Sequence, residues 1–199
     1  MEENSFEYAE EKRLYAELLL SEVEQRFGSQ AIYEKKRDKT PFDFEDTEKD
    51  KVCCFTGSRP EKLTRTPEEC KRLLVRAIMD SYEQGYRIYI SGMADGVDCW
   101  AAMAVLTMRC FYPEVRLVTA LPFPDRRKRG MDDLNTMICA LADLNVEVSG
   151  SYWPGAYDKR NKWMVEHSGR LIALMDDQNS GSGRTLRYAQ KNGLETLVL

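Results

Sequence analysis

Three loops rich in glycine and hydroxyl side chains are the parts of this sequence best suited to hold a ligand. Each follows an apolar run of strand length and precedes a segment with helical periodicity. Glycines let backbone N–H groups approach a ligand, and the N-terminus of a helix attracts anions. Such loops would bind the phosphates of a nucleotide-like molecule. They span residues 56–60, 91–98 and 176–185.

The first loop reads Thr56-Gly57-Ser58-Arg59-Pro60. Arg59 can bind a phosphate through two parallel hydrogen bonds, and Thr56 and Ser58 offer hydroxyls on either side of Gly57. We expect a phosphate or ribose contact here. An ordinary strand-to-loop turn with a solvent-facing arginine remains the alternative.

The second loop runs from Ser91 through Gly92 and Gly96 to Asp98, where a helix is expected to begin. The turn and the helix N-terminus would form an anion site. Asp98 complicates this interpretation, because a capping aspartate occupies free N–H groups and repels an anion, so it would instead hold a ribose hydroxyl. The spacing matches neither the Gly-x-Gly-x-x-Gly pattern nor a Walker A loop, which excludes classical dinucleotide and P-loop NTPase sites.

The third loop repeats the order of strand, glycine-containing loop and helix N-terminus. A flexible linker has a similar composition, and that alternative stays open. The polar and glycine positions of the loop are Asp176, Asp177, Gly181, Ser182, Gly183 and Thr185.

Two further segments offer aromatic and basic side chains. Tyr152 and Trp153 could stack a base, or they could merely cover the edge of the core, while Arg160 and Asn161 could make polar contacts. The run Arg126–Arg129 could bind phosphates, but such a run is usually a solvated face. Residues 51–199 hold 21 Lys/Arg against 18 Asp/Glu, and this weak positive balance argues against nucleic acid as a partner.

Other common chemistries find little support. His167 is the one histidine, it stands beside Ser168, and the chain has no Gly-x-Ser-x-Gly segment, so a Ser/His/Asp triad is not expected. The six cysteines include no Cys-x-x-Cys pair. We expect buried free thiols in a reducing compartment and no metal site.

From residue 51 onward, apolar runs alternate with helical segments, which predicts an α/β, Rossmann-like three-layer sandwich with a mostly parallel sheet. Right-handed crossovers would bring the three loops to the carboxyl edge of the sheet, where open α/β sheets bind ligands. The expected strands are 52–56, 87–91, 115–121, 146–149, 171–175 and 196–199. The expected helices are 67–84, 98–110, 131–144, 158–168 and 185–192.

Residues 1–50 form a different part of the chain, with 8 Lys/Arg against 15 Asp/Glu. An N-terminal amphipathic helix is expected over residues 4–27, with Gly28 as its C-cap, followed by a charged linker up to residue 50. This helix could pack on the main domain, pair with a second copy or bind a protein partner. The acidic start and the lack of a long apolar run predict a cytoplasmic protein without a membrane anchor.

The motifs, taken in order, resemble the YpsA-like branch of the SLOG (SMF/DprA-LOG) superfamily over residues 51–199. The resemblance implies a Rossmann-like domain whose glycine-rich loops bind nucleotides or nucleotide-derived ligands, including molecules of the ADP-ribose and NAD type. The segments that carry it are Phe55–Pro60, Ile90–Ala102, Tyr112-Pro113, Arg160-Asn161, Met164-Val165, Gly181–Thr185 and Tyr188-Ala189.

The sequence also departs from the pattern of these relatives. Ser58 stands where many of them have histidine, and Met93 stands where a second glycine is common. LOG enzymes, which cleave the N-glycosidic bond of nucleoside monophosphates, carry a glutamate soon after the threonine of the last loop, whereas Leu186, Arg187 and Tyr188 follow it here. Cleavage would then need Asp98, Asp176 or Asp177.

The resemblance and these departures favour binding without turnover. We expect a regulatory sensor of a nucleotide-type ligand, with no catalytic residue, no metal and no certain cofactor. The alternatives are a LOG-like nucleotide N-glycosidase (a phosphoribohydrolase) and a DprA-like accessory protein that binds single-stranded DNA. The expected ligand-binding residues are Thr56, Gly57, Ser58, Arg59, Ser91, Gly92, Gly96, Asp98, Arg160, Asn161, Asp176, Gly181, Ser182, Gly183 and Thr185.

Overall fold

Six parallel strands form a single sheet in the order β4-β3-β2-β1-β5-β6. The computed structural model describes residues 10, 13–19, 21, 25, 42–124 and 133–199. The predicted Rossmann-like α/β fold is confirmed, and the sheet is entirely parallel. The strands are β1 Val52–Gly57, β2 Ile88–Ser91, β3 Arg116–Leu121, β4 Leu144–Glu147, β5 Arg170–Leu174 and β6 Glu195–Val198.

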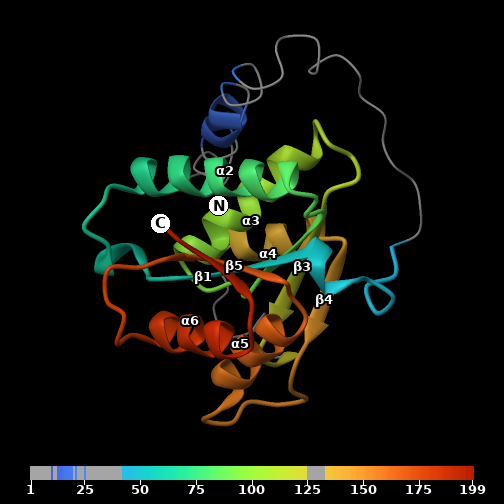
Figure 1. Ribbon diagram of the computed structural model, residues 1–199, viewed down its shortest axis with the longest axis vertical. Helices are drawn as coiled ribbons and strands as arrows, with labels where there is room; N and C mark the ends of the chain where they lie inside the picture. The colour runs from blue at the N-terminus through green and yellow to red at the C-terminus, as the bar shows by residue number, and fades with distance from the viewer. Residues whose placement is uncertain (1–9, 11–12, 20, 22–24, 26–41, 125–132) are drawn as a thin grey trace.

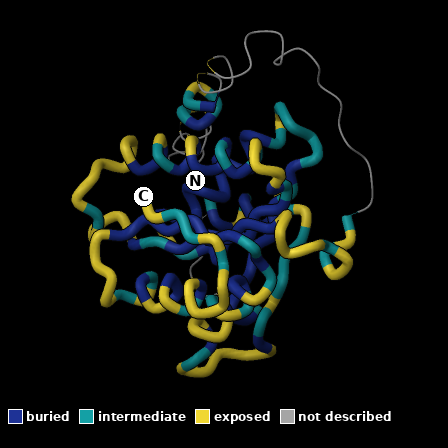
Figure 2. The backbone as a smooth tube through the Cα atoms, viewed as in Figure 1, coloured by how far each residue is buried: buried dark blue, intermediate teal, exposed yellow. Residues whose placement is uncertain are grey.

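Helices cover both faces of this sheet. The helices α2, α3 and α4 lie on one face, and α5 and α6 lie on the other (Figure 1). Strand residues alternate between the two resulting cores, so that Cys53 and Phe55 face the first core while Val52 and Cys54 face the second. Figure 2 shows the buried strands between helices whose outer sides are exposed. The first face carries α2 Pro67–Glu83, α3 Val97–Arg109 and α4 Asp133–Leu141, and the second carries α5 Ala156–Glu166 and α6 Gly181–Lys191.

Local sequence signals set both ends of α2. The Thr66 side chain accepts a hydrogen bond from the Glu69 N–H while the Glu69 carboxylate binds the Thr66 N–H, and Pro67 occupies the first turn. Such a capping box satisfies N–H groups that have no intrahelical partner. The helix stops where Gly85 adopts a φ of +99°, a conformation that glycine adopts without a steric penalty.

Among the strands, the largest error in the expected boundaries concerns β4, which covers Leu144–Glu147 rather than 146–149. Apolar and polar residues alternate throughout this stretch, so the pattern does not fix where pairing starts. Asn145 is acceptable within the strand because its side chain binds Thr119 Oγ1 at 2.6 Å and the Cys139 carbonyl at 3.0 Å. These bonds satisfy a polar group that would otherwise be costly to bury.

The N-terminal helical residues pack on the main domain, which was the first of the three arrangements expected for this helix. Residues 13–19 are helical, Tyr15 is fully buried and Leu19 is 2% exposed. Both belong to the same core cluster as residues of α2 and α3. The Lys71 amino group lies 5.8 Å from the Tyr15 ring centre and 5.7 Å from that of Trp100, which adds a cation–π contact. The expected C-cap, Gly28, lies outside the described residues.

All six cysteines are free thiols, and five of them are buried, as expected, whereas Cys110 is exposed. Burial raises the pKa of Cys54 to about 12, so this thiol stays protonated and unreactive. Within the part of the chain that the structure describes, no helix combines the length and the apolar character that crossing a membrane requires.

Candidate functional site

The strand order creates a switch point at the carboxyl ends of β1 and β5. These strands are neighbours, yet α2, which follows β1, and α6, which follows β5, cover opposite faces of the sheet (Figure 1). Open α/β sheets bind ligands at such points. Two hydrogen bonds connect the carboxyl end of β1 with that of β5 and the loops that follow them. The Ser182 hydroxyl donates to the Gly57 carbonyl at 2.6 Å, and the Ser58 N–H donates to the Leu174 carbonyl at 3.0 Å. The first and third loops therefore meet.

The second loop reaches the same place. A Cβ on Gly57 would overlap the Val97 side chain in the first turn of α3, so glycine is required where this helix approaches β1. Gly96 has a φ of +88°, and a Cβ there would lie 2.8 Å from Pro60 Cδ and 3.0 Å from the Ser58 carbonyl oxygen. All three glycine loops thus converge at one part of the carboxyl edge, which we call the rim.

Asp98 is not the N-cap of α3, contrary to expectation. Gly96 holds that position, and Asp98 belongs to the first helical turn. Its buried carboxylate accepts a hydrogen bond from the Ala94 N–H at 3.3 Å and lies 3.9 Å from Arg160 Nη1. Arg160 also donates to the Gly92 carbonyl. The Asp98 carboxylate therefore faces Arg160 and the Gly92 backbone inside the protein.

Burial raises the pKa of the Asp98 carboxyl group to about 6. The charge of Arg160 and the hydrogen bond from Ala94 lower this pKa, and the charge of Asp95 raises it, but loss of solvation has the largest effect. Asp98 can therefore take up a proton in weakly acidic solution. A titrating carboxyl group close to a predicted ligand site is often functional, although buried ion pairs in structural roles behave in the same way.

The third loop is a helical turn rather than a flexible linker. Helix α6 begins at Gly181, not at Thr185, and the Ser180 side chain caps it by accepting the Gly183 N–H at 3.2 Å. A Cβ on Gly183 would overlap the backbone of Gln178, so this tight turn requires glycine. The first-turn N–H groups of a helix have no intrahelical acceptor, which leaves them suited to bind an anion.

A pair of hydrogen bonds connects this turn to α5. Asn161 Nδ2 donates to Thr185 Oγ1 at 3.0 Å, and the Thr185 hydroxyl donates to the Gly181 carbonyl at 3.2 Å. Thr185 is buried, so its hydroxyl contributes to the support of the rim. Thr56 and Ser58 are buried as well, and Ser91 is buried with its hydroxyl bound to the Asp98 carbonyl at 2.8 Å.

Asp176 and Asp177 hold the backbone of the rim. Asp176 Oδ2 accepts the Thr64 N–H at 2.5 Å, and this hydrogen bond lowers the pKa of Asp176. Asp177 Oδ1 accepts the Asn179 N–H at 2.8 Å. Both carboxylates are exposed and Asp98 is buried, so the three acids considered for cleavage have different environments. The described residues contain no group of three His, Cys, Asp or Glu side chains suited to a metal ion.

Two arginines lie beside the glycine loops. Arg59 is exposed where the first loop leaves β1, immediately before the short helix η3, Pro60–Lys62. Arg184 was not among the expected site residues, yet its Nη2 lies 3.7 Å from the position that a Cβ on Gly181 would take, and it is exposed at the N-terminus of α6. Its place inside the Gly-Ser-Gly-Arg-Thr sequence was the signal that could have identified it.

Aromatic side chains gather between β4 and α5. Tyr152, Trp153 and Tyr157 are 54%, 47% and 40% exposed. The rings of Tyr152 and Tyr157 contact buried Phe123 edge-on, at centroid distances of 5.3 and 5.9 Å. Tyr152 and Trp153 are thus partly exposed at the edge of the core, and Tyr157 lies with them. The basic run Arg126–Arg129 lies outside the described residues.

Comparison with solved structures agrees with this architecture. The chain is similar to the X-ray structure of DNA processing protein A (DprA) from Streptococcus pneumoniae, with a TM-score of 0.57 and 16% identity, over 74% of this chain and 49% of that one. It is also similar to DprA from Helicobacter pylori, a structure described for its single-stranded DNA binding mode, with a TM-score of 0.52 and 20% identity, over 74% and 64%. At these identities the likeness concerns the fold.

Comparison of sequences identifies relatives that this chain matches over most of their length. A UPF0398 protein of Bacillus cereus strain B4264 is 28% identical over 156 residues, covering 72% of this chain and 84% of the relative. The SPbeta prophage-derived protein YoqJ of Bacillus subtilis strain 168 is 31% identical over 139 residues, covering 62% and 81%. The YpsA family model, described as the YspA SLOG family, matches residues 53–196. The chain therefore belongs to this family, as a member of the YpsA-like branch of the SLOG superfamily.

Proposed function

We propose that the rim binds the phosphates of a nucleotide-derived ligand and that the protein acts as a sensor of that ligand. One observation carries this proposal. The N-terminal turn of α6 is tied to the end of β1 at the switch point by the bond from Ser182 to Gly57. An anion at this turn would meet the N–H groups of Gly181 and Ser182, since Ser180 accepts that of Gly183, and the positive end of the helix dipole.

Arg59 and Arg184 would supply the counter-charge for the phosphates. Both are exposed, and they come from the first and third loops, which the structure brings together. Guanidinium groups bind phosphate oxygens in pairs of parallel hydrogen bonds. The base and ribose would extend toward α5, where Tyr157 is exposed in the first turn of the helix.

The state of the acidic side chains favours binding over hydrolysis. Asp176 and Asp177 are engaged by backbone N–H groups, and Asp98 lies under Gly92 beside Arg160. Hydrolysis of an N-glycosidic bond requires a carboxyl group that can reach the leaving base or the sugar. In this arrangement the carboxyl groups of the rim support its loops.

Isothermal titration calorimetry with ADP-ribose, NAD and AMP tests the proposal. Each of Arg59→Ala and Arg184→Ala should weaken binding about tenfold or more, since a hydrogen bond to a charged group contributes about 1.5–3 kcal/mol. Lys191→Ala is the matched control, because this exposed cation lies in the last turn of α6, at the opposite end from the rim. Absence of heat with all three nucleotides would refute the proposal.

A second experiment separates a sensor from an N-glycosidase. AMP and NAD are incubated with the protein, and chromatography then detects any free base, which an N-glycosidase releases and a sensor does not.

A second candidate function is binding of single-stranded nucleic acid, which the exposed aromatic rings favour. Tyr152, Trp153 and Tyr157 form a surface on which bases could stack, and the sequence places Arg126–Arg129 shortly after Phe123, to which two of these rings pack. Stacking on aromatic side chains combined with basic groups is the common mode of single-strand binding. The similarity to the Helicobacter pylori DprA fold also bears against the expectation that nucleic acid is not a partner.

Fluorescence anisotropy with a labelled oligothymidine distinguishes this function from the first. Affinity should decrease steeply as salt increases, and Trp153→Ala should weaken binding by about 5-fold to 100-fold, the effect of losing one stacked base. Leu141→Ala is a suitable control, because Leu141 is also apolar and 42% exposed but belongs to α4. Salt-independent affinity, or equal effects of the two substitutions, would count against nucleic acid as the ligand.

A further inference from the structure

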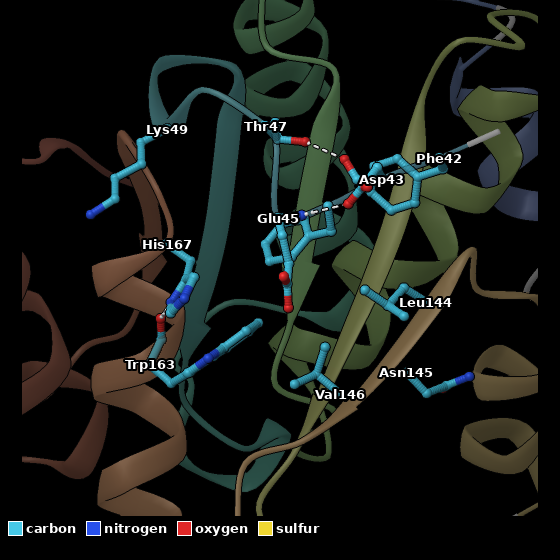
Figure 3. A pocket seen from close by; sticks show the side chains of 11 residues that line it. Phe42, Asp43, Glu45, Thr47, Lys49, Leu144, Asn145, Val146, Trp163 and His167 are labelled. Carbon is cyan, nitrogen blue, oxygen red and sulfur yellow. Dashed lines mark hydrogen bonds between the residues drawn. The ribbon is translucent and has the colours of Figure 1, made fainter. Parts of the chain in front are cut away.

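A cavity separate from the rim opens on the face of the sheet that carries α5. It has a volume of about 700 Å³, within the range of small-molecule sites. It lies between α5, the strand β4 and residues 42–49, and none of the expected rim residues line it (Figure 3). Its walls are formed by Phe42, Asp43, Phe44, Glu45, Thr47, Lys49, Leu144, Asn145, Val146, Trp163 and His167.

Residues 42–49, which form one wall of this cavity, are held by hydrogen bonds within the segment. Asp43 Oδ1 accepts the Glu45 N–H at 3.1 Å, and the Asp43 carbonyl accepts the Thr47 hydroxyl at 3.0 Å. The Thr47 N–H donates to the Phe44 carbonyl at 3.2 Å. This turn directs Phe42 and Phe44 against the second core, where they pack together with residues of β4.

Aromatic rings form one wall of the cavity. The Trp163 and His167 rings stack with their centroids 4.2 Å apart, and the Phe44 ring lies 5.9 Å from the first and 6.1 Å from the second. His167 Nδ1 lies 2.7 Å from the Trp163 carbonyl oxygen, so Nδ1 carries the proton and fixes the orientation of the ring. Leu144 and Val146 of β4 provide an apolar wall on the other side of the cavity (Figure 3).

The charges around this space favour a positive occupant. The Glu45 carboxylate projects between Trp163 and the β4 side chains, whereas the amino group of Lys49 points away from it (Figure 3). Asp43 is a second acidic residue of the wall. Aromatic faces attract cations through their negative π-surface, and a neighbouring carboxylate adds a direct charge. We propose that this cavity binds a small organic cation, an amine or quaternary ammonium with a compact apolar body.

Two probes of the same shape test the charge directly. Binding of choline and of its neutral isostere 3,3-dimethyl-1-butanol is measured by saturation-transfer NMR titration on the full chain. Choline should bind about tenfold more tightly, as expected when cation–π and carboxylate contacts replace an uncharged contact. Because this site shares no residue with the rim, added ADP-ribose should not compete with choline, and the result is independent of the proposed function.

Two substitutions assign the effect to the cavity. Glu45→Gln should abolish the preference for choline over the isostere, and Trp163→Leu should weaken both probes. Asp46→Asn removes a charge that is also exposed from the neighbouring residue, which does not line the cavity, and should leave binding unchanged. Glu45 is exposed, so its substitution tests charge without disturbing the core. Failure of choline to bind, equal affinity for the two probes, or a preference that survives Glu45→Gln would overturn the proposal.

Discussion

The Asp98 carboxylate lies 3.9 Å from Arg160 Nη1, directly beneath Gly92. A Cβ on Gly92 would overlap the guanidinium group and lie 2.8 Å from Asp98 Oδ2. Gly92 is therefore required because a buried ion pair underlies it, a structural reason different from the expected approach of a ligand. Asp98 and Arg160 link α3 to α5 across the carboxyl end of β2, so a change in the charge of Asp98 would act on all three elements.

The burial of Asp98 predicts a pH-dependent stability. The pKa of Asp98 is about 6 in the folded protein and about 3.9 when the chain is unfolded. Between these values the folded state binds more protons, so the contribution of Asp98 to the free energy of unfolding is greatest below pH 4 and decreases as the pH rises through 6. The expected decrease is about 2 kcal/mol from pH 4 to pH 7.

Urea unfolding of the protein and of its Asp98→Asn variant across this pH range measures the effect. The difference between the two free energies should change by that amount, because the amide side chain of the variant does not titrate and the contributions of other groups cancel. A difference that stays constant with pH for Asp98→Asn would show that this carboxyl group keeps an ordinary pKa.

The contact between Gly57 and Val97 predicts a paired effect on folding. Gly57→Ala should destabilise the protein by about 1–3 kcal/mol, since the new methyl group overlaps the Val97 side chain in a packed region. Val97→Ala in the same chain should restore part of the loss. Gly150→Ala is the comparison, because a Cβ there has no atom within 4 Å. Thermal unfolding of these three variants and of Val97→Ala alone provides the measurement, and additive losses in the double variant would contradict the contact.

The complete burial of Tyr15 predicts that the N-terminal helix contributes to the stability of the main domain. Tyr15→Ala should lower the free energy of unfolding by about 3–5 kcal/mol, the usual effect of removing a buried aromatic ring. Glu17→Ala, at an exposed position of the same helix, should have little effect. Denaturant unfolding provides the measurement. Equal stability of the two variants would mean that the helix leaves the domain in solution.

The hydrogen bond from the Thr64 N–H to Asp176 is expected to order the segment before α2. Asp176→Asn replaces a charged acceptor of the Thr64 N–H by a weaker neutral one. Amide hydrogen exchange at Thr64 should become several-fold faster, whereas Asp177→Asn should act at Asn179 instead. In the unsubstituted protein the same bond weakens as the pH falls through the lowered pKa of Asp176, so exchange at Thr64, corrected for its intrinsic pH dependence, should increase in acid. Unchanged protection in both tests would exclude this bond.

Sequence patterns located most elements, because they depend on local chemistry. The capping box of Thr66 and Glu69 and the glycine after α2 act within a few residues of chain, so they can be recognised directly. The limits of β4 could not be predicted, since they depend on Asn145 finding partners in β3 and α4. The start of α6 was also placed too late, because glycine opposes helix formation in general but is tolerated in a first turn capped by Ser180.

The sequence by itself determined the alternation of strands and helices, the glycine loops and their resemblance to one family, all of which depend on residue type and order. Only the tertiary structure decided the rest. It turned Asp98 inward to Arg160, added Arg184 to the rim, packed Tyr15 onto the domain and formed an open cavity beside Trp163. Each of these features joins residues from separate elements, and their distances depend on how the helices pack against the two faces of the sheet.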